Sequence, residues 1–180
     1  MWRTGLILAV LLSALAMMAR AGNVQPLLDK LGQAETEAAA SALIPQIWND
    51  WINGHANDAE KEQMRAGLQA MERRDLAAAE KLFSELVETN PAFVEAWNKR
   101  ATIRFMRGDL SGSESDVIQV LTLEPRHFGA ISGLGLISLQ QDNPEKALRA
   151  YEILLRVHPF SQDARRFVPE LRERLGISDI

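Results

Sequence analysis

The stretch that decides the fold is residues 128–161, FGAISGLGLISLQQDNPEKALRAYEILLRVHPFS, because its pattern occurs three times in succession. Three prolines mark the period, since they follow one another at one constant spacing: Pro91, Pro125 and Pro159. Alignment on these prolines divides this part of the chain into three equal segments, 60–93, 94–127 and 128–161. A period of this length is typical of proteins built by stacking one structural unit.

Equivalent positions of the three segments share their chemistry. Small residues occupy two columns, Gly67, Ala101, Gly135 and Ala79, Ser113, Ala147, and bulky residues occupy two more, Phe83, Val117, Tyr151 and Leu86, Val120, Leu154. Small residues allow two helix backbones to approach closely, and bulky residues three or four positions further on lie on the same helix face. Each segment is therefore predicted to be a hairpin of two helices.

Polar pairs between the two halves of each segment predict where the second helix begins. They stand at equivalent positions: Arg74-Asp75, Gly108-Asp109 and Asp142-Asn143. Aspartate and asparagine are preferred helix N-caps, and the proline near the end of each segment closes the second helix.

The segments resemble the tetratricopeptide repeat (TPR), whose pattern is W-x2-L-G-x2-Y, then A-x3-F, then P. The third segment matches through Ile131, Leu134, Gly135, Ser138, Ala147, Tyr151 and Pro159, the second through Trp97, Ala101 and Pro125, and the first through Gly67, Ala79, Phe83 and Pro91. The three segments follow one another without an insertion from position 60 to position 161, which is more than half of the chain. The resemblance implies an all-α fold, a right-handed TPR solenoid of three helical hairpins.

Three glycines crowd the start of the third segment, at 129, 133 and 135. A phosphate-binding loop would need GxxxxGK[ST], or GxGxxG after a buried strand, and neither pattern is present. Gly135 instead stands in a small-residue column, so we expect it to serve helix packing.

The flanks predict further helices. Residues 162–180 are expected to form a capping helix and tail, because one face gathers Ala164, Phe167, Val168, Leu171 and Leu175. Residues 22–59 are expected to form an N-terminal helical extension, interpreted as a degenerate leading repeat in which Trp48 and Trp51 pack on the first repeat. Pro45 interrupts the helical pattern of this segment.

Residues 1–21 are typical of a secretory signal peptide: Arg3 precedes an apolar stretch, and small residues flank the expected cleavage after Ala21. The alternative is an uncleaved anchor, although the apolar stretch is shorter than the ~20 residues that span a bilayer. We expect a periplasmic or secreted bacterial protein. The membrane would then be contacted only through the signal segment, if that segment is retained.

Composition excludes several chemistries. The chain has no cysteine, which removes disulfides, thiol nucleophiles and thiolate metal sites. A net charge of −4 offers no cationic surface for nucleic acid. His55, His127 and His158 show no metal-ligand spacing, and solvated or capping roles are expected for them. No catalytic constellation, cofactor site or metal site is predicted, and the protein is expected not to be an enzyme.

A basic cluster in the second segment stands out within an acidic chain. Its members are Lys99, Arg100, Arg104 and Arg107. One interpretation is that the arginines pair internally with carboxylates such as Asp75, Glu114 or Asp116. The other is a binding site for an acidic segment or a terminal carboxylate.

The TPR resemblance also implies a concave groove lined by the first helix of each repeat. Its expected lining is Lys61, Met64, Leu68, Met71, Glu95, Asn98, Thr102, Phe105, Ser132, Leu136 and Leu139, with Gly129 beside them. Only Asn98 resembles the Lys/Asn clamp of chaperone-binding relatives, so that specificity is not carried over. We expect an exported adaptor that binds a peptide or protein partner, of unknown identity, in this groove. The alternatives are a structural envelope-assembly or oligomerisation module, whose oligomeric state is also unknown, and a membrane-tethered TPR protein.

Overall fold

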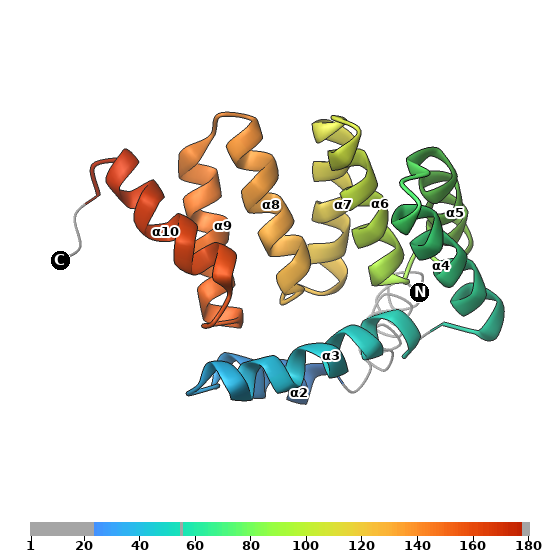
Figure 1. The fold of residues 1–180 in the computed structure, drawn as a ribbon, viewed down its shortest axis with the longest axis horizontal. Helices are drawn as coiled ribbons and strands as arrows, with labels where there is room; N and C mark the ends of the chain where they lie inside the picture. Colours follow the sequence, from blue (N-terminus) through green and yellow to red (C-terminus); the bar gives the residue numbers. More distant parts are fainter. Residues whose placement is uncertain (1–23, 55, 178–180) are drawn as a thin grey trace, which may run out of the picture.

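The computed structural model describes residues 24–54 and 56–177, and these residues form nine α-helices and no strand (Figure 1). The helices are α2 (Val24–Gly32), α3 (Glu37–Asn53), α4 (Asp58–Glu72), α5 (Leu76–Thr89), α6 (Val94–Met106), α7 (Leu110–Leu123), α8 (Phe128–Gln140), α9 (Pro144–Val157) and α10 (Gln162–Arg174). The predicted all-α fold is confirmed. The signal segment and His55 lie outside the described residues.

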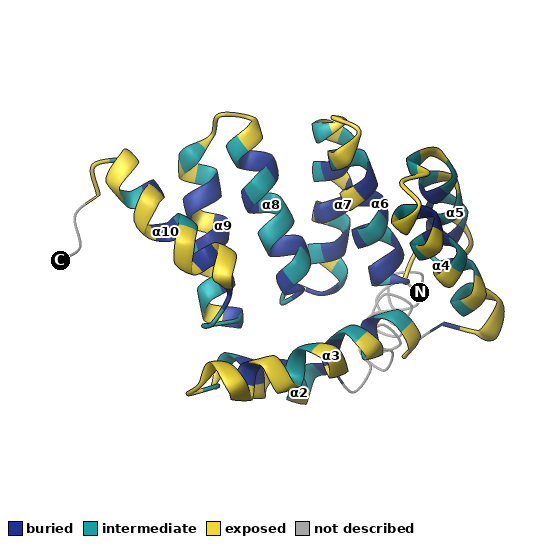
Figure 2. Cartoon of the chain, viewed as in Figure 1, coloured by how far each residue is buried: buried dark blue, intermediate teal, exposed yellow. Residues whose placement is uncertain are grey.

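Six of these helices form the three predicted hairpins, α4–α5, α6–α7 and α8–α9. Each second helix contacts the first helix of the next repeat, and α10 packs on α9 in the same way. Figure 1 shows the hairpins side by side along the long axis of the molecule, so the array grows by stacking. In Figure 2 the buried residues gather on the facing sides of these helices.

The turns inside the hairpins follow the sequence prediction. The carboxylates of Asp75 and Asp109 and the side-chain oxygen of Asn143 each accept the N–H three residues further on, at 3.1, 2.9 and 3.0 Å. The residue before each cap has a positive φ: 59° at Arg74, 82° at Gly108 and 52° at Asp142. These caps satisfy N–H groups that would otherwise lack a partner at the helix start.

The small-residue column brings the two helices of a hairpin together. A Cβ on Gly67 would lie 2.6 Å from the ring of Phe83, and a Cβ on Gly135 would lie 2.5 Å from the ring of Tyr151. Both rings are fully buried. Gly135 therefore serves packing, as the sequence predicts.

The N-terminal extension is helical, but it does not continue the stack. A leading repeat would lay its second helix along α4, whereas α3 touches α4 only near its end and also reaches α6, and α2 contacts α9. Figure 1 shows α2 and α3 running along one edge of the hairpins. The interpretation as a degenerate leading repeat is therefore corrected: the hairpin α2–α3 lies across the array.

Pro45 does not end α3, which runs on to Asn53. Proline removes one backbone donor from a helix. Within the described residues, no helix combines the length and apolar character needed to cross a bilayer.

Candidate partner-binding groove

The first helices of the repeats, α4, α6 and α8, carry the residues expected to line the groove. Three of these side chains, on α4 and α6, are buried: Met64, Glu95 and Asn98. The others are open to solvent to different degrees, with Thr102 exposed and Lys61, Leu68, Met71, Phe105, Ser132, Leu136 and Leu139 half-buried. We call the buried part of this expected lining the closed half and the accessible part the open half.

Helix α3 covers the closed half of the expected lining with two tryptophans. Trp51 stacks on the ring of His127, with 3.9 Å between centroids and 18° between planes. Trp48 meets the ring of Phe128 edge-on at 5.2 Å, and the ammonium group of Lys99 lies 5.0 Å from the centroid of Trp48. Aromatic stacking and cation–π contacts of this kind stabilise beyond the area they bury.

His127 connects the tryptophans to the backbone of α8. Its Nδ1 accepts the N–H of Ala130 at 3.1 Å, so its proton sits on Nε2, which donates to Oε2 of Glu95 at 3.0 Å. The imidazole is fully buried. Of the solvated or capping roles expected for His127, the capping role is correct, and the ring is buried against the carboxylate of Glu95.

His158 is the other described histidine. It lies at the C-terminal end of α9 and is half-buried. Burial lowers the pKa of its imidazole below the ordinary histidine value. The neutral ring is therefore favoured in the folded protein.

Glu95 is the charge at the centre of the closed half. Burial, the largest single influence, opposes its ionisation, but the hydrogen bond from His127 and the charge of Lys99 hold its pKa below the ordinary glutamate value. The ammonium group of Lys99 lies 2.8 Å from Oε1, and the amide of Asn98 donates to Oε2 at 3.1 Å. Asn98 is therefore committed to an internal carboxylate and is not free to clamp the C-terminus of a peptide.

The arginines of the basic cluster form ion pairs inside the array. Arg100 makes two hydrogen bonds to Asp116, at 2.9 and 2.7 Å. Arg104 binds Asp116 at 2.9 Å and Glu80 at 3.2 Å, and Arg107 binds Glu80 as well. These contacts agree with the interpretation that the arginines pair with carboxylates of the same chain. They link α5, α6 and α7.

Of the carboxylates named from the sequence, only Asp116 pairs with an arginine of the cluster. Asp75 caps α5, and Glu114 forms an ion pair with Lys146. Glu80 was missed. Because the second helix of one repeat packs against the first helix of the next, a carboxylate on α5 was the signal that could have identified it.

Ser132 and Lys61 also bind within the chain. The hydroxyl of Ser132 donates to Asp163 of the capping helix at 2.7 Å, and the ammonium group of Lys61 lies 3.6 Å from Asp58. The open half is left with Leu68, Met71, Thr102, Phe105, Leu136 and Leu139, a lining that is apolar except for one hydroxyl.

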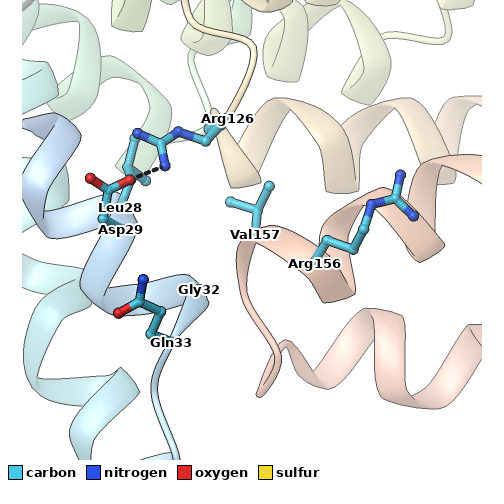
Figure 3. A pocket seen from close by; sticks show the side chains of 7 residues that line it. All are labelled: Leu28, Asp29, Gly32, Gln33, Arg126, Arg156 and Val157. Atoms are coloured by element: carbon cyan, nitrogen blue, oxygen red, sulfur yellow. Dashed lines mark hydrogen bonds and ion pairs between the residues drawn. The ribbon is translucent and has the colours of Figure 1, made fainter.

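A shallow pocket of about 320 Å³ lies where the hairpin α2–α3 meets the array (Figure 3). Its lining is Leu28, Asp29, Gly32, Gln33, Arg126, Arg156 and Val157. The guanidinium of Arg126 points to Asp29 and is paired with it, whereas that of Arg156 points away from the pocket. The polar groups do not converge on one point.

Within residues 24–54 and 56–177 no three His, Asp or Glu side chains gather as a metal ion would require.

The stacked hairpins define a helical-repeat scaffold, and comparisons with known proteins agree. The sequence profile of the tetratricopeptide repeat matches residues 64–125 and 133–176. A TPR repeat-containing protein of Rhizobium etli is 32% identical over 154 residues, which are 86% of this chain and 75% of that protein. The chain belongs to the tetratricopeptide repeat family.

Solved structures share the fold. The first TPR domain of Spaghetti (RPAP3), bound to the HSP90 peptide SRMEEVD, has a TM-score of 0.62 at 18% identity, over 65% of this chain and 93% of that one. The crystal structure of MamA has a TM-score of 0.62 at 17% identity, over 82% of this chain and 85% of that one. At such identities the likeness concerns the fold alone.

Proposed function

We propose that the protein is an exported, non-enzymatic adaptor that binds a peptide or a segment of a partner protein. The observation that supports this proposal is that apolar side chains from three successive repeats, at positions expected to line the groove, are only half-buried. TPR proteins are generally scaffolds that present such a surface, and the Spaghetti domain binds a peptide.

The character of the open half favours an apolar segment as ligand. Phe105, Leu136 and Leu139 present carbon surface, and the hydroxyl of Thr102 donates to the carbonyl of Asn98 at 3.0 Å. Peptides recognised through a terminal carboxylate fit poorly, because Glu95 places a buried negative charge beside Asn98. Affinity would come from apolar burial, with Met71 adapting to varied side chains.

Site-specific photo-crosslinking tests the location of this site. A photoreactive phenylalanine analogue at Thr102 should capture a partner from cell-envelope extract, and the same analogue at Ile118 is the matched control. Ile118 lies on α7 and is 55% exposed. A product formed from Thr102 alone, and lost in a Leu136→Glu variant, supports the proposal. The same products from both positions contradict it.

Export is proposed from residues 1–21 alone, with cleavage after Ala21. N-terminal sequencing of the protein isolated from the envelope distinguishes the two fates of this segment. A mature chain that starts at Gly22 supports the exported adaptor, whereas an intact Met1 supports a TPR protein tethered to the membrane.

A second candidate is an assembly module that makes contact through its outer face. Ile118 on α7 and Ile153 on α9 are 55% and 39% exposed, and exposed apolar side chains can mark an association site. Light scattering gives the mass in solution. A multimer that an Ile118→Glu variant converts to monomers would favour this candidate over the groove adaptor.

A further inference from the structure

The contact between α3 and the repeats has the composition of an interface between two proteins. Its centre is aromatic, with Trp51 stacked on His127 and Trp48 against Phe128. Trp48 fits closely against the backbone of α8, because a Cβ on Gly129 would lie only 2.8 Å from its ring. Aromatic anchors that fill a complementary surface are typical of binding hot spots.

Polar contacts surround this centre. The amide of Gln25 donates to Glu124 at 2.6 Å, and Asp29 is paired with Arg126. Both contacts join α2 to the turn that precedes α8. A buried aromatic centre within a polar rim is the usual anatomy of an association surface.

The position of α3 also departs from the order of the array. Trp51 and His127 are separated by nearly all of the first two repeats, yet their rings are in contact.

We propose that the hairpin α2–α3 is an intramolecular ligand of the repeat array. The N-terminal halves of α6 and α8 form a seat for an amphipathic helix with two tryptophans one turn apart, and α3 fills that seat. An external partner is thereby confined to the open half of the concave face. Only this last consequence rests on the proposed function.

Cleavage of the connection after Gly54 tests the proposal in the intact protein. A protease site inserted there allows the folded chain to be cut, which leaves the hairpin held by its contacts alone. We expect the hairpin to co-elute with the repeats at high concentration and to exchange with an added, fluorescently labelled hairpin. The repeats should keep their helical circular dichroism signal after the hairpin has left.

Substitutions then define the seat. Trp51→Ala in the labelled hairpin should weaken its binding about 100-fold or more, the usual cost of truncating a buried tryptophan. Gly129→Ala in the repeats should weaken binding about tenfold, since its Cβ would press on Trp48. Gly133→Ala is the matched control on the same helix, because its Cβ would meet Val117 at an ordinary 3.8 Å. Binding of the hairpin to this control should stay within about twofold of the wild type.

Two results would overturn the inference. Loss of the helical signal, or aggregation, when the hairpin leaves would make the hairpin part of the core and not a ligand. The same conclusion follows if neither the wild-type nor the Trp51→Ala hairpin exchanges. The measurement uses no external partner, so its outcome is independent of the proposed groove function.

Discussion

Two neighbouring glycines on α8 should respond to alanine in opposite directions. At Gly133 a Cβ would find its nearest neighbour, Val117, at 3.8 Å, so alanine adds helix propensity without a clash. Replacing glycine by alanine inside a helix is worth about 1 kcal/mol. We expect Gly133→Ala to raise the free energy of unfolding by about that amount.

At Gly135 the same gain is opposed by a clash. The new methyl would lie 2.5 Å from the ring of Tyr151, which is fully buried and stacks on Phe167 with 5.0 Å between centroids. Overpacking of this kind costs about 1–3 kcal/mol, with a severe contact near the upper end. The net effect of Gly135→Ala should therefore be a loss of about 1–2 kcal/mol.

Urea and thermal unfolding followed by circular dichroism measure both variants. For a chain of this size about 1 kcal/mol corresponds to about 2–4 °C in Tm, so the two melting curves should move apart by several degrees. In a double variant, Gly135→Ala with Tyr151→Leu, the combined loss should be smaller than the sum of the two single losses, because the smaller side chain leaves room for the methyl. Equal stabilities of Gly133→Ala and Gly135→Ala would refute the packing role assigned to Gly135.

Three further predictions concern charges. Asp116→Ala should lower the free energy of unfolding by about 3–5 kcal/mol in urea melts, because it leaves the buried Arg100 without its partner, whereas Glu170→Ala at an exposed pair should cost less than about 1 kcal/mol. Because the pKa of Glu95 is lowered by folding, its contribution to stability is complete above about pH 4.3 and is lost as pH falls through the lower folded value. Acid titrations of stability should be shallower in Glu95→Gln than in the wild type, and equal slopes would contradict this. Because burial lowers the pKa of His158, the folded state binds its proton less readily, and stability should fall as pH drops below about 6.5. Urea melts between about pH 8 and about pH 5 should show a smaller fall in His158→Gln, and an unchanged fall would rule out this source.

The repeats could be predicted from the sequence because their determinants are local and periodic. A cap such as Asp75 acts three residues away, and the pair Gly135 and Tyr151 belongs to one hairpin. Each feature recurs from repeat to repeat, so the pattern can be recognised without any homologue. The expected set of groove positions follows from the same period and the family resemblance.

The placement of α3 could not be predicted in this way. Its seat depends on single contacts between distant residues, such as Trp51 on His127, and no periodicity encodes them. The capping role of His127 was expected, but its buried contacts with Glu95 and Trp51 were missed for the same reason. Its carboxylate partner Glu95 lies at the opposite end of the same segment, 94–127, at a position that the repeat pattern assigns to the groove.

The hairpin α2–α3 also sets the distance between the outer repeats of the solenoid. Ala40, near the start of α3, belongs to the apolar cluster of the third repeat, whereas Ile52, near its end, packs on that of the first. Because a helix rises about 1.5 Å per residue and is nearly rigid, α3 fixes the separation of the outer repeats. An array with an inserted fourth hairpin would be longer than α3 can span. The three repeats present should resist stretching more than the same repeats without α3.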